Sequence, residues 1–94
     1  MTTVGIATGA GRGMGLACAH RMAATVDHLL LVDLDEEAAT ASARRLVGEQ
    51  PRAAVEAIVL DVSDRTGVKR LADRVDQLGE LRAVAHAEIG RAHV

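Results

Sequence analysis

Glycine occupies every second position in a stretch near the start of the chain, from Gly9 to Gly15 (GAGRGMG), directly after the short apolar run Val4–Thr8. Because glycine has no Cβ, the backbone can take positive φ there, and a pyrophosphate can approach main-chain N–H groups. A helix that begins behind the loop adds unpaired N–H donors and the positive end of its dipole. The spacing indicates a phosphate-binding loop, and a glycine-rich turn without a ligand is the alternative.

Two carboxylates follow later apolar runs. Asp33 ends the run His28–Asp33 and lies 18 residues after Gly15, near the roughly 20-residue interval at which a dinucleotide-binding fold places an acid on the adenosine ribose. Asp61 follows the run Ala53–Leu60, and a carboxylate at that sheet edge is placed to meet an adenine amino group. The alternatives are a solvated residue at a strand end for Asp33 and a plain turn residue for Asp61.

Other site chemistries find little support in the sequence. No Gly-Lys-Ser/Thr follows the glycines, which argues against a P-loop nucleotide triphosphatase. The single cysteine, Cys18, excludes an internal disulfide, and no Cys/His spacing resembles a zinc site. We therefore expect a metal-free chain. Its histidines are scattered: His20, His28, His86 and His93.

Composition narrows the class of protein further. The 94 residues are 49% hydrophobic and 26% charged, with a formal net charge of −2, which is typical of a globular chain and gives no electrostatic reason to expect nucleic acid or an anionic membrane as partner. The N-terminus lacks a basic segment followed by an apolar core, and no stretch approaches the roughly 18 apolar residues of a membrane helix. We expect a cytoplasmic chain that forms one small domain or part of a larger one.

Strand and helix patterns alternate along the first half of the chain. A strand is predicted over Val4–Thr8, a helix from near Gly13, and a second strand over His28–Asp33, whose continuous apolar run is typical of a strand buried on both faces of a parallel sheet. A second helix is predicted to start at the acidic stretch Asp35–Glu37. The predicted inner-face residues of the two helices are Leu16, Ala19 and Ala23, then Ala39, Ala43, Leu46 and Val47, with Gly48 suited to the C-terminal cap.

The second half continues the alternation. A third strand is predicted over Ala53–Leu60, a helix capped by Ser63 or Asp64, and a fourth strand over Leu81–His86. The helix carries apolar residues at helical spacing and ends at a glycine: Val68, Leu71, Ala72, Val75 and Leu78, then Gly79. The pattern predicts an α/β fold with about four parallel strands in the order 3-2-1-4, three helices, and a ligand at the C-terminal ends of the strands.

The glycine stretch also carries a family signature. Thr8–Gly15 fits the Thr-Gly-x-x-x-Gly-x-Gly pattern of short-chain dehydrogenases/reductases, and Asp33, Asp61-Val62 and the run Val84–Ala87 follow later strands. Over residues 4–87 the chain resembles this family, whose members transfer hydride between a nicotinamide cofactor and an alcohol or carbonyl. The resemblance implies that residues 1–87 are the N-terminal portion of an NAD(P)-binding Rossmann domain.

The resemblance further implies a set of cofactor contacts. The glycine loop would hold the pyrophosphate, Arg12 and Met14 would border the cofactor, Asp33 would contact the ribose diol, and Asp61 with its neighbour would contact adenine. The implied cofactor-binding residues are Gly9, Gly11, Arg12, Gly13, Met14, Gly15, Asp33, Leu34, Asp61, Val62 and Ala87.

The choice of cofactor depends mainly on Asp33. A carboxylate repels a 2′-phosphate and accepts hydrogen bonds from a free diol, so NAD is favoured over NADP. Arg12 points the other way, because NADP-using members of the family often carry a basic residue there, but no second basic residue directly follows Asp33. Two positions depart from the family pattern: Thr25–Asp27 replaces a glycine before the second strand, and His86-Ala87 stands where many members have two asparagines.

The family's catalytic tyrosine, the lysine four residues later and the substrate-orienting serine have no counterpart. The chain contains no tyrosine, and its single lysine, Lys69, lies in the third predicted helix. We therefore expect the inactive, cofactor-binding portion of an NAD-dependent oxidoreductase, whose full-length form would be a homo-oligomer acting on an alcohol or carbonyl substrate. A free-standing nucleotide-binding module with a regulatory or structural role is the alternative.

The last seven residues, Glu88–Val94, do not continue the family pattern, which calls for Ala-Gly after Ala87. They resemble the in-frame translation of a common short-read sequencing adapter, GAG ATC GGA AGA GCA CAC GTC, whose next codon in that frame is a stop. We therefore expect Glu88–Val94 to be adapter read-through and not native sequence. A natural C-terminal tail is the alternative.

Overall fold

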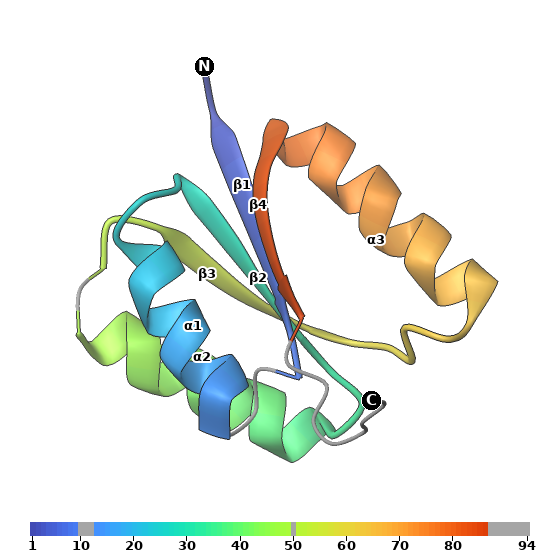
Figure 1. The fold of residues 1–94 in the computed structure, drawn as a ribbon, viewed down its shortest axis with the longest axis horizontal. Helices are drawn as coiled ribbons and strands as arrows, with labels where there is room; N and C mark the ends of the chain where they lie inside the picture. Colours follow the sequence, from blue (N-terminus) through green and yellow to red (C-terminus); the bar gives the residue numbers. More distant parts are fainter. Residues whose placement is uncertain (10–12, 50, 87–94) are drawn as a thin grey trace.

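The computed structural model describes residues 1–9, 13–49 and 51–86, and within these ranges the strands form one parallel sheet (Figure 1). The strand order is β3-β2-β1-β4, with all three pairings parallel. This confirms the predicted order 3-2-1-4, in which consecutive strands are joined by helical crossovers. The strands are β1 (Thr3–Thr8), β2 (His28–Asp33), β3 (Ala54–Val59) and β4 (Glu80–His86).

One helix follows each of the first three strands, and the helices cover both faces of the sheet. Figure 1 shows α1 (Gly13–Ala23) and α2 (Glu36–Gly48) on one face and α3 (Arg65–Leu78) on the other. The predicted alternation of strands and helices is confirmed. None of the helices in the described ranges is both long and apolar enough to cross a membrane.

The central strands bury side chains on both faces, as their continuous apolar sequences predict. Leu29 and Leu31 point into the core beneath α1 and α2, whereas Leu30 points into the core beneath α3, because successive strand side chains alternate between faces. All three leucines are 0% exposed. Full burial of a leucine side chain stabilises a fold by roughly 1.5–3 kcal/mol, so β2 is the energetic centre of the sheet.

Helix α2 packs on the sheet through a face rotated from the predicted one. Its buried residues are Ala39, Ser42 and Leu46, whereas Val47 is 55% exposed. The prediction that Val47 faces inward is wrong because it lies a further 100° around the helix from Leu46, beyond the surface that meets the sheet. Ala43 is partly buried against the same core, as predicted.

The C-terminal cap of α2 also differs from the expectation. The helix includes Gly48 and is capped by Glu49, whose backbone N–H donates to the carbonyl oxygens of Leu46 and Val47. Glu49 has φ −90°, a conformation open to any residue. The predicted cap role of Gly48 is therefore wrong, because this helix end does not turn through the left-handed region that favours glycine.

Helix α3 begins at a predicted cap, but fewer of its apolar side chains pack against the sheet than predicted. Asp64 is its N-cap and accepts a hydrogen bond from the Thr66 backbone N–H at 3.0 Å. Leu71 and Val75 are buried, but Val68 is 43% exposed. Within the described residues α3 lies alone on its face of the sheet (Figure 1), so its flank has no neighbouring helix to cover it.

Gly79 allows a close approach between the end of α3 and the start of the sheet. Its N–H donates to the Val75 carbonyl oxygen at 2.9 Å, and the N–H of Glu80 donates to the Thr2 carbonyl oxygen at 2.8 Å. A Cβ on Gly79 would overlap that Thr2 carbonyl. The predicted helix end at Gly79 therefore has a steric reason, which is the passage of the chain against residue 2.

Candidate functional site

The predicted site residues that the structure describes lie at the edge of the sheet where the parallel strands end. Gly9 follows β1, Asp33 is the last residue of β2, and Asp61 lies two residues beyond the end of β3. The backbone N–H of Leu60 donates to the Asp33 carbonyl oxygen at 3.2 Å, which ties the chain leading to Asp61 to the end of β2. Ligands of open α/β sheets bind at this edge.

The turn after β1 uses the conformational freedom expected of its first glycine. Gly9 has φ 64°, a left-handed conformation that an L side chain rarely adopts. Helix α1 then begins at Gly13, and Gly15 in its first turn is buried. Gly11 and Arg12 lie outside the described residues, as does the side chain of Met14.

The helices differ in the charges at their N-terminal ends. Asp35 caps α2 and Asp64 caps α3, so each of these ends has a carboxylate of its own. The first turn of α1 contains no acidic residue. Because helix N-termini carry unpaired N–H groups and a partial positive charge, the α1 end can attract an anion such as a phosphate.

Asp33 is held in place by the backbone that follows it. Its Oδ1 atom accepts a hydrogen bond from the Asp35 N–H at 3.0 Å, and its side chain is half-buried. Asp35 in turn accepts from the N–H groups of Glu37 and Ala38. Leu34, between the two aspartates, is 69% exposed. The Asp33 carboxylate therefore stands in a fixed position beside an exposed apolar residue and an acidic helix start.

Asp61 is held by a single residue through two hydrogen bonds. Its Oδ1 atom accepts from the Ser63 hydroxyl at 2.7 Å and from the Ser63 backbone N–H at 2.9 Å. These bonds, the hydroxyl first, hold the pKa of Asp61 below its ordinary value because they stabilise the ionised carboxylate. Val62 lies beside it, 38% exposed.

Ser63 is the residue whose part at this edge was not predicted. Its only predicted role was that of an alternative helix cap, and the cap of α3 is Asp64. The available signal was the spacing Asp61-Val62-Ser63, because aspartate side chains commonly accept from the N–H two residues later. Ala87, the last predicted contact, lies outside the described residues, immediately after β4.

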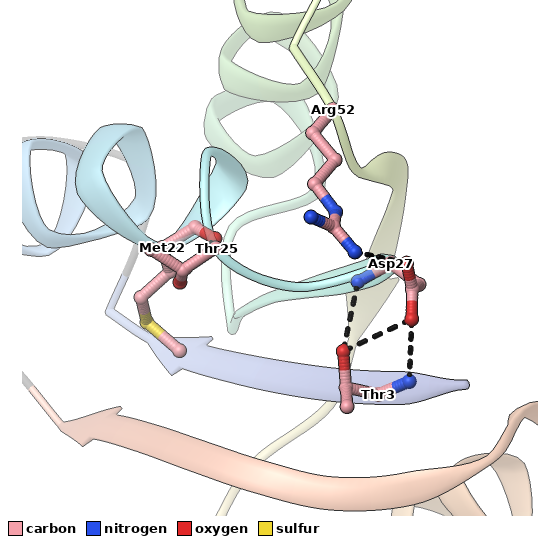
Figure 2. A network of polar contacts seen from close by, with 5 residues as sticks. All are labelled: Thr3, Met22, Thr25, Asp27 and Arg52. Carbon is pink, nitrogen blue, oxygen red and sulfur yellow. Dashed lines mark hydrogen bonds and ion pairs between the residues drawn. The ribbon is translucent and has the colours of Figure 1, made fainter. Parts of the chain in front are cut away.

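A second polar cluster lies at the opposite edge of the sheet, where the strands start (Figure 2). Asp27 Oδ2 accepts from the Thr3 N–H at 2.8 Å and from the Thr3 hydroxyl at 3.1 Å, and Asp27 Oδ1 accepts from Arg52 at 3.0 Å. Together, the Thr3 N–H first, these donors lower the pKa of Asp27 to about 2. The cluster joins the starts of β1, β2 and β3, so its contacts support the fold.

The described part of the chain was predicted to be free of metal, and its acidic and histidine side chains are spread over several elements. Across residues 1–9, 13–49 and 51–86, no group of three or more His, Cys, Asp or Glu side chains could hold a metal ion. The acidic residues at the site edge are engaged with backbone N–H groups and with Ser63, as described above. The described residues place hydrogen-bond acceptors and a helix N-terminus at this edge.

Comparison with known proteins agrees with this arrangement. A family model described as short chain dehydrogenase matches residues 3–87. The chain is 35% identical over 86 residues to 1-deoxy-11-beta-hydroxypentalenate dehydrogenase of Streptomyces exfoliatus, a match that covers 90% of this chain and 30% of that protein.

Solved structures give the same result. A short chain dehydrogenase/reductase from Burkholderia phymatum in complex with NAD is 31% identical with a TM-score of 0.77, over 88% of this chain and 29% of that one. L-sorbose reductase from Gluconobacter frateurii, complexed with NADPH and L-sorbose, is 29% identical with a TM-score of 0.69, over 81% of this chain and 28% of that one. The chain thus spans less than a third of these relatives, and it belongs to the short-chain dehydrogenase/reductase family of oxidoreductases.

Proposed function

We propose that this chain is the dinucleotide-binding part of an oxidoreductase that transfers hydride between NAD(H) and an alcohol or carbonyl substrate. The observation that carries the proposal is the meeting of three features at one sheet edge. These are the left-handed turn at Gly9 leading into α1, the fixed carboxylate of Asp33 at the end of β2, and the carboxylate of Asp61 after β3.

Each feature suits one part of a dinucleotide. The N-terminal end of α1, which follows the left-handed Gly9 closely and has no acidic residue in its first turn, suits a pyrophosphate, because a helix N-terminus offers backbone N–H groups and a partial positive charge. Asp33 suits the adenosine ribose diol, and Asp61 suits the adenine amino group, since each carboxylate accepts hydrogen bonds. For the other predicted contacts the proposed role rests on the family resemblance. These are Gly11, Arg12, Met14 and Ala87, together with Leu34 beside Asp33 and Val62 beside Asp61.

The preference for NAD is a separate part of the proposal. Relatives of this chain have been solved with NAD and with NADPH, so the family by itself leaves the choice open. Asp33 supports NAD because its charge repels a 2′-phosphate, and Glu36 and Glu37 add negative charge in the first turn of the following helix.

The bound nicotinamide would supply the hydride chemistry, and the residues of this chain would bind and orient the cofactor. The chain has no tyrosine to transfer a proton to the substrate oxygen, and its one lysine, Lys69, lies on α3. We therefore propose that the catalytic serine, tyrosine and lysine belong to a part of the longer protein outside this sequence, and that the longer protein is a homo-oligomer.

Titration with NADH and NADPH tests the cofactor proposal. We expect the chain to bind NADH more tightly, and Asp33→Asn to reduce the ratio of the two affinities by roughly tenfold, because the repulsion of the 2′-phosphate is removed. Asp73→Asn is the matched control, since it removes the same charge from an exposed position on α3. Tighter binding of NADPH by the unsubstituted chain would contradict the proposal.

The absence of tyrosine is also compatible with a competing function, a free-standing nucleotide-binding module with a regulatory or structural role. The two functions differ in whether the gene continues in frame into Tyr-x-x-x-Lys. Sequencing the source locus decides between them and also shows whether Glu88–Val94 is encoded there. A locus that encodes Glu88–Val94 and then a stop codon, in codons different from those of the adapter, would overturn the read-through hypothesis and support the module.

A further inference from the structure

Two aspartates of this chain are held in the same way at opposite edges of the sheet. They differ in whether the second carboxylate oxygen also accepts a hydrogen bond. Asp27 accepts the N–H and hydroxyl of Thr3 on one carboxylate oxygen, and its other oxygen accepts from Arg52 (Figure 2). Asp61 accepts the N–H and hydroxyl of Ser63 on Oδ1. No residue in the described part of the chain donates to Asp61 Oδ2.

The backbone around Asp61 is fixed on both sides. The N–H of Asp64 donates to the Asp61 carbonyl oxygen at 2.9 Å, and the N–H of Leu60 donates to the Asp33 carbonyl oxygen at 3.2 Å. Gly67 lies directly beneath, where a Cβ would come within 3.4 Å of the Asp61 carbonyl oxygen. The remaining freedom is the rotation of the Asp61 side chain, and the two Ser63 bonds restrain it.

We infer that Ser63 is the positioning residue for adenine recognition: it holds Asp61 through Oδ1 and leaves Oδ2 to accept a hydrogen bond from the 6-amino group of the adenine ring. The inference rests on the proposed dinucleotide site and names how that site distinguishes an adenine from a purine without the amino group. Ser63 itself acts through Asp61, so its effect depends on the group carried at the purine 6-position.

The charge state of Asp61 follows from the same contacts. The Ser63 donors hold the pKa of Asp61 below its ordinary value, which keeps the carboxylate ionised, and an ionised acceptor forms a stronger hydrogen bond with an amino group than a neutral one. Removing the hydroxyl, which contributes most to this lowering, raises the pKa toward that value. The recognition of the 6-amino group should then weaken at a higher pH than in the unsubstituted chain.

A matched pair of ligands tests the role of Ser63. NADH carries the 6-amino group, whereas reduced nicotinamide hypoxanthine dinucleotide carries a carbonyl oxygen in its place and a proton on the neighbouring N1, and the rest of the molecule is the same. The ratio of the two affinities isolates recognition at the edge of the purine that carries N1 and the 6-substituent, because a general loss of folding lowers both affinities together. Ligand-observed NMR is suited to the measurement, since the chain has no Phe, Tyr or Trp to crowd the adenine signals.

We expect the unsubstituted chain to favour NADH, and Ser63→Ala to reduce that preference by about threefold to tenfold, in line with the loss of an oriented charged acceptor. Ser63→Thr, which keeps the hydroxyl, should restore the preference. Thr66→Ala is the control, because it removes a hydroxyl from the same helix start while the backbone N–H of Thr66 still donates to Asp64. The acid limb of the preference should also move to higher pH in Ser63→Ala.

The possible results distinguish the proposed dinucleotide site, the adenine role of Asp61 and the positioning role of Ser63. Failure of the unsubstituted chain to bind NADH overturns the proposed dinucleotide site and the positioning role with it. Binding of NADH without any preference over the hypoxanthine analogue leaves the proposed function intact and overturns the adenine role of Asp61. A preference that Ser63→Ala leaves unchanged overturns the positioning role of Ser63 alone.

Discussion

At the scale of single residues, Asp27 is the centre of the polar cluster at the edge where the strands start. It belongs to the stretch that replaces the family's usual glycine before the second strand, and it accepts hydrogen bonds from Thr3 and Arg52, residues 24 and 25 positions away. These partners lie at the start of β1 and just before β3. One carboxylate therefore ties three strand starts together.

The contacts of Asp27 predict a specific dependence of stability on pH. Its pKa in the folded chain, about 2, lies below the ordinary value of 3.8, so the ionised side chain contributes stability that is fully present above about pH 4 and is lost as the pH falls through about 2. Asp27→Asn should flatten the fall in the free energy of unfolding over this range, as measured by circular dichroism in urea at low protein concentration.

Arg52→Gln provides a graded comparison for this prediction. It removes the second largest contribution to the lowered pKa and leaves the Thr3 N–H, the largest, in place. The acid limb of Arg52→Gln should therefore lie between those of the unsubstituted chain and Asp27→Asn. Identical acid limbs for all three chains would show that this carboxylate has no part in acid stability.

At the scale of the elements, the connection from α3 to β4 is sterically constrained. Gly79 passes so close to the Thr2 carbonyl that any side chain on it would overlap backbone atoms. Gly48, at the end of α2, has open space around its Cα instead, with nothing within 4 Å of a Cβ placed there. The two glycines thus form a matched pair in opposite environments.

Alanine at these two glycines should change stability in opposite directions. Gly79→Ala should lower the free energy of unfolding by about 1–3 kcal/mol, because the backbone must shift to admit the Cβ. Gly48→Ala should raise it by up to about 1 kcal/mol, since alanine favours the helical state and meets no neighbour. Urea denaturation of both variants measures the difference. A neutral Gly79→Ala would refute the steric account of this connection.

At the scale of the whole molecule, the α3 face and the outer edge of β4 remain uncovered by the described residues. Leu81 is 47% and Val84 58% exposed. Their strand partners Val4 and Ile6 belong to the core beneath α3, so both side chains point to that face. A groove lined by Val68, Leu71 and Leu81, among others, runs between α3 and the sheet.

This surface predicts that the isolated chain associates with itself. An unpaired apolar edge strand offers backbone hydrogen bonds and apolar area to a second chain. We expect the apparent mass in sedimentation experiments to rise with concentration, and Val84→Lys to reduce the rise by charging the exposed face. Val47→Lys, at a valine of 55% exposure on α2, should leave association unchanged. A chain that stays monomeric and unfolds cooperatively at high concentration would contradict this expectation.

The whole chain is also expected to lack turnover. A purified sample given NAD and an alcohol, or NADH and a ketone, should produce no change in NADH absorbance above a blank, because no tyrosine is present to transfer the proton. Preparations of an Asp33→Asn variant, made in parallel, identify activity from contaminating dehydrogenases, which would appear equally in both. Turnover that is confined to the unsubstituted chain would refute the expectation.

The amino-acid sequence by itself determined the strand order, the alternation of strands with three helices and the edge at which Gly9, Asp33 and Asp61 lie. These features follow from local patterns, namely apolar periodicity, glycine turns and acids at strand ends, and a parallel sheet with helical crossovers admits few arrangements. Most predicted element bounds lie within one or two residues of those observed.

Only the tertiary structure decided which residues complete those elements. The exposure of Val47 depends on how α2 is rotated about its axis against the sheet. Apolar spacing alone does not fix this rotation to within one residue, so it could not separate Val47 from the buried Leu46. The contact between Thr3 and Asp27 spans 24 residues, so no local pattern contains it. Ser63 is close to Asp61 in sequence, but the sequence left both Ser63 and Asp64 as possible caps of α3. In the structure Asp64 is the cap, and the Ser63 hydroxyl donates to Asp61 instead.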